Sequence, residues 1–216
     1  EECAINDDGS TAMTGFFSGE AALGGVQLKG VRDARFLVKL SPEGEVSYAR
    51  PLDEGWRVRI ALDPAGGLFV SGVLSPGADL GDGPVSPDTF GKLFLAKLDG
   101  SGSVLWMNVF AGSGAVTGMT ITPEGGVLLA GELTGSLDLG LGPLPGAGSG
   151  RPPTPFLARF GPRGTALWSR TFGDGDETRL TAVRIVDMDH AVVCGSTAGD
   201  LDLGAGPMPR SRRLDA

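Results

Sequence analysis

The chain has few cysteines, one histidine and no long apolar run. It contains 216 residues but only two cysteines, Cys3 and Cys194, too few for a disulfide scaffold or a cysteine-ligated zinc site. No run of about 20 apolar residues occurs, so no membrane-spanning helix is expected. Both cysteines stand where related segments carry small or apolar residues, which predicts two buried free thiols.

Basic charge is also scarce. The formal net charge is −8, which argues against nucleic-acid binding because that function needs a basic surface to neutralise phosphate. The first residues, "EECAIND", are acidic where a signal peptide would be basic and then apolar. We therefore expect the sequence to begin at the start of a mature chain or of a fragment.

Glycine, in contrast, is abundant, and it marks a repeat. The 37 glycines predict many turns, and the absence of long helical patterns predicts that these turns join short strands. Three segments are nearly the same: "FLVKLSPEGEVSYARPL" from Phe36, "FLAKLDGSGSVLWMNVF" from Phe94 and "FLARFGPRGTALWSRTF" from Phe156. The chain therefore repeats a unit of about sixty residues.

Each unit is expected to form four short antiparallel strands. In the second unit these are "VRIALD", "LFVSGVL", "LFLAKLD" and "SVLWMNVF", and the first and third alternate apolar and polar residues. The turns between them carry the Gly, Pro and Asp of tight hairpins. Repeated four-stranded units of this kind predict an all-β fold of β-propeller blades, with units at 1–52, 53–110, 111–172 and an incomplete 173–216. The Gly- and Pro-rich segments between the second and third strands are expected to be rim loops.

Segments such as "GMTITPEGGVLLAG" and "TGSLDLG", together with the three quoted above, resemble the bacterial β-propeller repeats called SBBP. This resemblance covers almost the whole chain. It implies a secreted or cell-surface protein, in some cases a lipoprotein, without assigned activity, and it supplies no catalytic residues. It therefore implies a non-catalytic scaffold or interaction module, located outside the cell or in the cell envelope, with a protein or a carbohydrate as partner.

The blade count bears on association. About three and a half blades leave a first and a last blade face open, so the sequence predicts a partial propeller that is either a fragment or self-associates through these faces. An unusually small closed ring is a third alternative. The fragment is the preferred interpretation.

The alternative function is a propeller hydrolase or lyase with its site at the central channel, where the first strands of the units converge. Arg57, Arg59, Arg179 and Arg184, with Asp63, are expected near that region and are candidates for anion binding. Three or more titratable groups converging in one channel pocket would favour the enzyme, and scattered groups would favour the scaffold.

Metal binding has a first candidate site in an acidic loop, and Asp187 and Asp189 form a second acidic pair with the same two interpretations. Asp174, Asp176 and Glu177 in "GDGDET" are potential oxygen ligands for calcium, although the loop lacks the spacing of known calcium loops and is interpreted first as a polar connection. No other cofactor is expected. Asp79, Asp138 and Asp202 recur in "DLG" of three units, and recurrence favours a structural role in which each carboxylate accepts bonds from backbone N–H groups.

The histidine and three recurring aromatic residues are two further features of the sequence. The histidine, His190, lies in a turn and is interpreted as a solvated polar residue without a catalytic partner. Tyr48, Trp106 and Trp168 occupy equivalent positions in the fourth strands, as either an exposed stripe for a carbohydrate or protein, or residues that pack on the neighbouring strand of the same sheet. Packing is the preferred interpretation.

Overall fold

The structure is a computed structural model of the 216-residue chain. It describes residues 1–52, 58–75, 78–81, 83–89, 91–146, 148, 151–172, 178–188, 190–197, 202 and 206. Within these residues helix is limited to the 3-10 turn η1 (Pro87–Thr89), and none of them forms a helix that could span a membrane.

The strands form four antiparallel sheets that follow one another along the chain, as predicted. The first sheet has the order β1 (Glu2–Ile5), β2 (Thr11–Leu23), β3 (Val26–Leu40), β4 (Val46–Leu52). The second has the order β5 (Val58–Leu62), β6 (Leu68–Val73), β7 (Leu93–Leu98), β8 (Val104–Val109). The third contains β9 (Ala111–Ile121), β10 (Val127–Asp138), β12 (Thr154–Phe160) and β13 (Ala166–Thr171), and the fourth contains β14 (Thr178–Ile185) and β15 (Ala191–Thr197).

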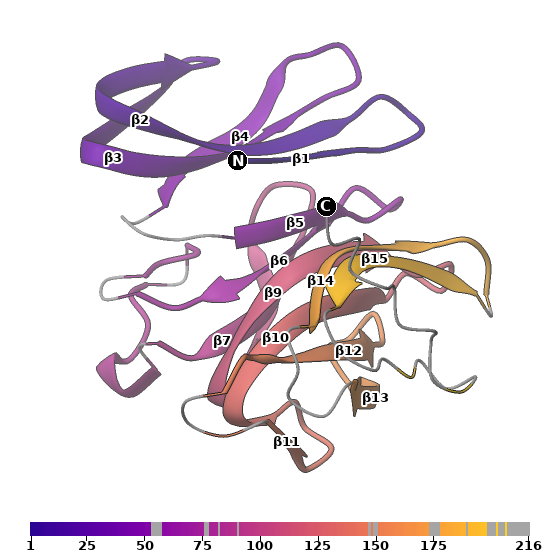
Figure 1. The fold of residues 1–216 in the computed structure, drawn as a ribbon. Helices are drawn as coiled ribbons and strands as arrows, with labels where there is room; N and C mark the ends of the chain where they lie inside the picture. Colours follow the sequence, from indigo (N-terminus) through magenta and orange to yellow (C-terminus); the bar gives the residue numbers. More distant parts are fainter. Residues whose placement is uncertain are drawn as a thin grey trace, which may run out of the picture.

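The sheets stack face to face around their first strands. Figure 1 shows the first sheet at the top, the second and third below it, and β14 and β15 beside the third. The inner strands follow the same order, because β1 neighbours β5, β5 neighbours β9, and β9 neighbours β14. Four-stranded antiparallel sheets stacked in this way are β-propeller blades, so the predicted fold class is confirmed.

Stacking explains why the strands of the second sheet are buried on both faces. Phe94, Ala96 and Leu98 of β7 pack into a core shared with the first sheet. Leu93 and Leu95, on the opposite face of the same strand, pack into a core shared with the third sheet. The sequence alternation predicted one buried face for such a strand. The second face becomes buried because another sheet covers it.

A third core, between the third sheet and β14, is smaller. Among the described residues, the first two cores contain 15 buried residues each, whereas the third contains six. Its members come from the third sheet, from the residue that follows β13 and from β14: Leu128, Ala130, Leu157, Phe172, Leu180 and Val183. The fourth sheet thus stacks on the third through its inner strand.

Consecutive sheets are also joined at their outer strands. A Cβ built on Gly102, in the turn between β7 and β8, would lie 2.9 Å from the ring of Tyr48 on β4. The same relation recurs one unit later, where a Cβ on Gly164 would lie 2.9 Å from the ring of Trp106 on β8. An aromatic residue of each outer strand therefore packs on the glycine turn of the next unit, a contact that we call the aromatic–turn contact.

The connection from β10 to β12 is not only the loop that the sequence predicted. Pro143–Pro145 form a short strand, β11, that pairs with Ser136–Asp138 of β10. In the second unit, the equivalent connection contains η1 and an isolated bridge between Asp79 and Pro84. The Gly and Pro content indicated turns correctly. It did not indicate that β10 extends past Leu133, the last residue that pairs with β12, so that Ser136–Asp138 can pair with β11.

Candidate functional site

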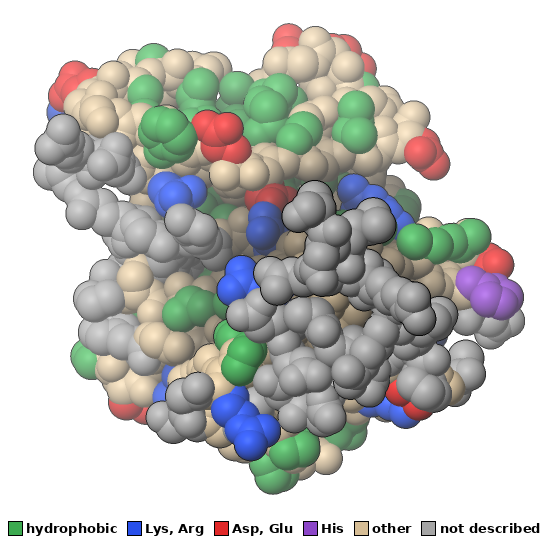
Figure 2. Space-filling model, viewed as in Figure 1, with side chains coloured by type: hydrophobic (Ala, Val, Ile, Leu, Met, Phe, Trp, Pro, Cys, Tyr) green, Lys and Arg blue, Asp and Glu red, His purple; other side chains and the backbone are tan. Residues whose placement is uncertain are grey.

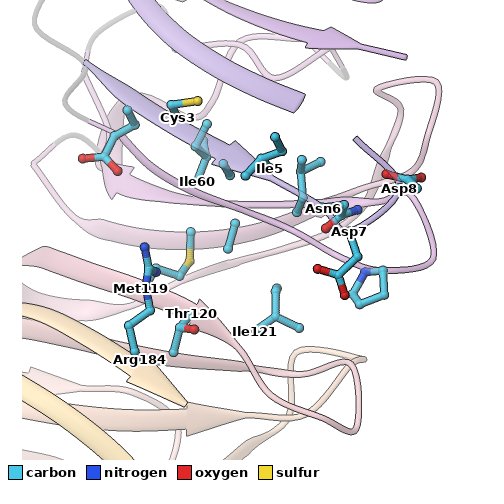
Figure 3. Close-up of a pocket in the computed structure, with 15 residues that line it drawn as sticks. Cys3, Ile5, Asn6, Asp7, Asp8, Ile60, Met119, Thr120, Ile121 and Arg184 are labelled. Atoms are coloured by element: carbon cyan, nitrogen blue, oxygen red, sulfur yellow. The ribbon is translucent and has the colours of Figure 1, made fainter. Parts of the chain in front are cut away.

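A cavity of about 650 Å³ lies where the inner strands of three sheets converge, and it is the candidate functional site. Figure 3 shows that its walls are side chains of β1, β5 and β9, with Arg184 contributed by β14. The apolar part of the lining includes Ile5, Ile60, Leu62, Met119 and Ile121. The cavity therefore occupies the central-channel position that the sequence indicated for a site.

Charged side chains stand at opposite ends of this cavity. Arg184 lies at one end, and Asp7 and Asp8 lie at the other (Figure 3). Asp8 is engaged locally, because its Oδ1 accepts a hydrogen bond of 2.8 Å from the backbone N–H of Ser10. Arg184 lies on an exposed part of β14. Four charged residues line the cavity, counting Glu2, but the arginine and the two aspartates do not meet.

Arg59 lies beside the cavity and links three sheets. Its Nη1 donates to Oε1 of Glu2 on β1 in an ion pair, and its Nε donates to the carbonyl of Val116 on β9 at 3.4 Å. Burial lowers the pKa of the Arg59 guanidinium, which still remains protonated near neutral pH. This arginine therefore holds β1, β5 and β9 together, and its donors are directed at protein oxygens.

Asp63 is a second charged residue that is used within the fold. It is buried, and its carboxylate forms an ion pair with Lys97 of β7 and accepts a hydrogen bond of 3.0 Å from the N–H of Ala65. Its backbone carbonyl accepts a hydrogen bond of 3.1 Å from Asn6 Nδ2 in the first unit. Asp63 thus fixes its own turn and the turn of the preceding unit.

The other predicted anion-binding residues are placed differently. Arg179 is exposed on β14 and does not line the cavity, and Arg57 lies outside the described residues. Of the four arginines, Arg184 alone is among the lining residues that the structure gives for this cavity. Anion binding by these four arginines stays a prediction, and Arg184 is the one that lines the cavity.

The calcium candidates Asp174, Asp176 and Glu177 lie outside the described residues, as does Asp189 of the second acidic pair. Within the part of the chain that the structure describes, no three His, Cys, Asp or Glu side chains form a group that could hold a metal ion. Calcium binding at "GDGDET" therefore stays a prediction.

The recurring aspartates have the same structural role in three units, as predicted. Oδ1 of Asp138 accepts hydrogen bonds from the N–H groups of Gly140 and Gly142, at 2.8 and 3.1 Å. Oδ1 of Asp79 makes the matching pair of bonds, at 2.6 and 3.1 Å, and Asp202 accepts from Gly206 at 3.0 Å. Each carboxylate closes a glycine turn that follows the second strand of its unit.

His190 is exposed in its turn, where Nδ1 lies 2.8 Å from Oδ1 of Asp187. The expected burial of the two thiols is wrong, since both Cys3 and Cys194 are exposed. Cys3 lies on β1 of the first sheet and lines the cavity, and Cys194 lies on β15. Equivalent positions in the middle of the stack are covered by a neighbouring sheet on each face, whereas these two belong to the first and last sheets.

Tyr48 and Trp106 pack inside the fold, as preferred, and they also have a partner that was not predicted. They meet the turn of the next unit rather than only a neighbouring strand of their own sheet. Two positions further along each strand, a polar side chain donates to the same turn: Arg50 to the carbonyl of Gly102, and Asn108 to that of Gly164 at 2.7 Å. Sequence reasoning missed these donors, although their aromatic-x-polar spacing recurs in the sequence.

Comparison with known proteins gives no family. No protein-family model and no curated protein matches the chain. A protein of unknown function from Bacteroides caccae matches in structure with a TM-score of 0.48 and 14% identity, over 77% of this chain and 48% of that one. The Dos1 propeller matches with a TM-score of 0.42 and 15% identity, over 84% of this chain and 38% of that one. The chain thus spans less than half the length of either solved structure.

The fold of this chain is defined by its own sheets. Their order, antiparallel pairing and stacking make the chain a β-propeller-type repeat protein.

Proposed function

We propose that the chain is a non-catalytic scaffold and interaction module, built from propeller units similar to SBBP repeats, that works at the cell surface or outside the cell. The observation that supports the scaffold role is the engagement of Arg59 with Glu2 and Val116. Arg59, which was predicted to lie near the channel, bonds to residues of two neighbouring sheets.

The charges of the cavity fit a scaffold better than an enzyme. General acid–base catalysis needs a base within hydrogen-bond reach of the group it deprotonates. Here Glu2 is paired with Arg59, Asp8 is bonded to its own turn, and Arg184 stands at the far end of the cavity from both aspartates. The charged side chains thus line the same cavity, but they are not arranged as a catalytic acid and base around one substrate position.

The aromatic residues favour a protein over a carbohydrate as partner. A carbohydrate platform needs a row of exposed aromatic faces, but of the three equivalent residues Trp168 alone is exposed, at 40%. Tyr48 is 8% exposed, and Trp106 packs against Phe69 with ring centroids 5.9 Å apart. Open apolar surface lies instead on sheet faces, such as the hydrophobic side chains gathered over the first sheet in Figure 2. Ile5 and Phe16 of that sheet are 71% and 57% exposed. Apolar faces of this kind are typical of protein contacts.

A comparison of two arginine variants in the full chain tests the scaffold role. Arg59→Met should lower the free energy of unfolding by about 1–2 kcal/mol, because Glu2 loses its partner in a half-buried place. Arg184→Met, at an exposed position, should change it by less than about 0.5 kcal/mol. Chemical denaturation measures both. If the channel were an active site, removing Arg59 would leave stability unchanged or raise it, and that result would contradict the proposal.

A further inference from the structure

The repeat shows which residues of the inner cavity the fold itself requires. The inner strands contain the equivalent triplets "CAI", "IAL", "MTI" and "VRI", whose central residues are Ala4, Ala61, Thr120 and Arg184. All four central residues line the cavity. Three of them are small and uncharged, so the fold builds this position without a charge. The guanidinium group of Arg184 is therefore an addition to the repeat.

Asp7 departs from the repeat in the same way. The turn after each of the first three inner strands is closed by a backbone hydrogen bond of 2.8–2.9 Å: Gly9 N–H to Asn6, Gly66 N–H to Asp63 and Gly125 N–H to Thr122. The residue after the acceptor is Asp7 in the first unit, and Pro64 and Pro123 in the next two. Proline suits this turn position because its φ is preset. The carboxylate of Asp7 is therefore not needed to form the turn.

Both added charges are accessible from the cavity. Arg184 is exposed, and Figure 3 shows its side chain reaching toward Met119. Asp7 is exposed at the other end of the cavity, and the ion pairs and hydrogen bonds of the described residues involve neither of these two side chains. The charge of Glu2, in contrast, is balanced by Arg59. The cavity thus has a positive end and a negative end.

The walls between these ends combine apolar side chains with backbone groups. The apolar lining comes from all three inner strands β1, β5 and β9. Among the described residues, each of these strands pairs with one other strand, so N–H and C=O groups of its second edge border the cavity. A ligand that fits these walls has apolar side chains, amide groups along its length and opposite charges at its two ends.

We propose that the cavity binds a short apolar peptide with free termini, its carboxylate at Arg184 and its ammonium group at Asp7 and Asp8. A guanidinium group holds a carboxylate through two parallel hydrogen bonds, and a carboxylate pairs with an ammonium group. The volume of about 650 Å³ lies within the range of ligand cavities.

The distance between the charged ends sets the length of the peptide. The two ends belong to the first and the fourth sheets, and neighbouring sheets pack roughly 10 Å apart, so a single amino acid is too short. An extended peptide of three to five residues reaches about 10–17 Å. This ligand goes beyond the scaffold role and does not depend on it, because that role is tested by the stability of Arg59→Met and this proposal by binding to the parent chain.

The tetrapeptide Ala-Leu-Leu-Ala is the probe, and isothermal titration calorimetry with the full chain measures its binding. Two blocked forms, one acetylated at the amino terminus and one amidated at the carboxyl terminus, should each bind about tenfold more weakly, because each loses one charge. Aminoundecanoate carries both charges on a chain of the same length without amide groups, and it should also bind about tenfold more weakly. Equal binding of aminoundecanoate would overturn the assignment of a peptide.

Variants of the two ends locate the peptide. In Arg184→Gln, the free and the amidated peptide should bind equally. The double variant Asp7→Pro with Asp8→Ala copies Pro64 and Ala65 of the second unit, and it should bind the free and the acetylated peptide equally. Each comparison is a ratio within one variant, so a partial loss of folded protein does not change it.

Arg163→Gln is the matched control. Arg163 is exposed in the turn between β12 and β13 and is not among the residues that line the cavity. That variant should keep the preference of the parent for both free termini. Absence of saturable binding to the parent, or terminal preferences that survive the substitutions at Arg184, Asp7 and Asp8, would overturn the proposal.

Discussion

The indole of Trp106 lies against Gly164, a residue of the next unit, and its Nε1 donates a hydrogen bond of 3.2 Å to the neighbouring carbonyl of Pro162. The turn glycine has a positive φ of 79°, a conformation that residues with a Cβ adopt at a cost. Glycine therefore serves two needs here: it forms the turn of one hairpin, and it leaves room for an aromatic ring from the preceding unit.

Tyr48 makes the equivalent contact one unit earlier, and its ionisation should report on that contact. Burial raises the pKa of Tyr48 to about 12. It is the only tyrosine of the chain, so the absorbance of tyrosinate during an alkaline titration follows this one group. We expect a midpoint near 12 in the folded chain and near 10 in denaturant. A midpoint near 10 while circular dichroism still shows folded protein would contradict the packing.

The same shift predicts how stability depends on pH. Because the folded-state pKa lies above the unfolded one, the contribution of Tyr48 is fully present below about pH 10 and is lost as pH rises from there through 12. Tyr48→Phe should remove this loss. It should cost little at neutral pH, since the buried Oη has no hydrogen-bond partner among the described residues. Denaturation curves of both chains across the alkaline range measure the difference.

Position in the stack, more than residue type, should decide the effect of substitutions in the inner strands. Leu62 and Ile5 are equivalent in the repeat, but Leu62 is 4% exposed between the first two sheets and Ile5 is 71% exposed. Leu62→Asp should lower the free energy of unfolding by about 3–5 kcal/mol, because an unpaired carboxylate is buried. Ile5→Asp should change it by less than about 0.5 kcal/mol. Thermal and chemical unfolding measure both variants. Equal losses of stability for the two substitutions would contradict the stacking.

The aspartate turns should behave as structural elements without a metal. Asp138→Ala removes the acceptor for the N–H groups of Gly140 and Gly142 and should cost about 1–2 kcal/mol, whereas Asp138→Asn keeps a side-chain oxygen and should cost less. Calcium or a chelator should shift the melting temperature of these variants no differently from that of the parent. A calcium effect present in the parent and lost in both variants would instead show an ion site at Asp138.

The sheets were predictable from sequence because their cause is local. Alternation in "FLAKLD", glycine-marked turns and three copies in register place each strand without knowledge of its neighbours in space. The role of Asp138 was predictable for the same reason, since an aspartate two and four residues before glycines bonds within its own turn.

Contacts between units were not predictable in this way. The partner of Arg59 is Glu2, in the preceding unit, and the partner of Trp106 is a turn in the following one. Both depend on how one sheet is rotated over the next, which no periodicity within a strand encodes. The exposure of Cys3 has a related cause, because its strand belongs to the first sheet and the residues that match it in the repeat are covered by a preceding one.

The most direct test of the aromatic–turn contact between consecutive units compares alanine substitutions of two turn glycines. Gly44 and Gly164 are equivalent, and their positive φ values of 84° and 79° give both alanine variants the same backbone cost. A Cβ on Gly164 would meet Trp106 at 2.9 Å, whereas one on Gly44 would meet nothing within 4 Å. Measured by chemical denaturation, Gly164→Ala should therefore lose about 1–3 kcal/mol more than Gly44→Ala. Equal losses would show that the units stack without the aromatic–turn contact and would contradict this account.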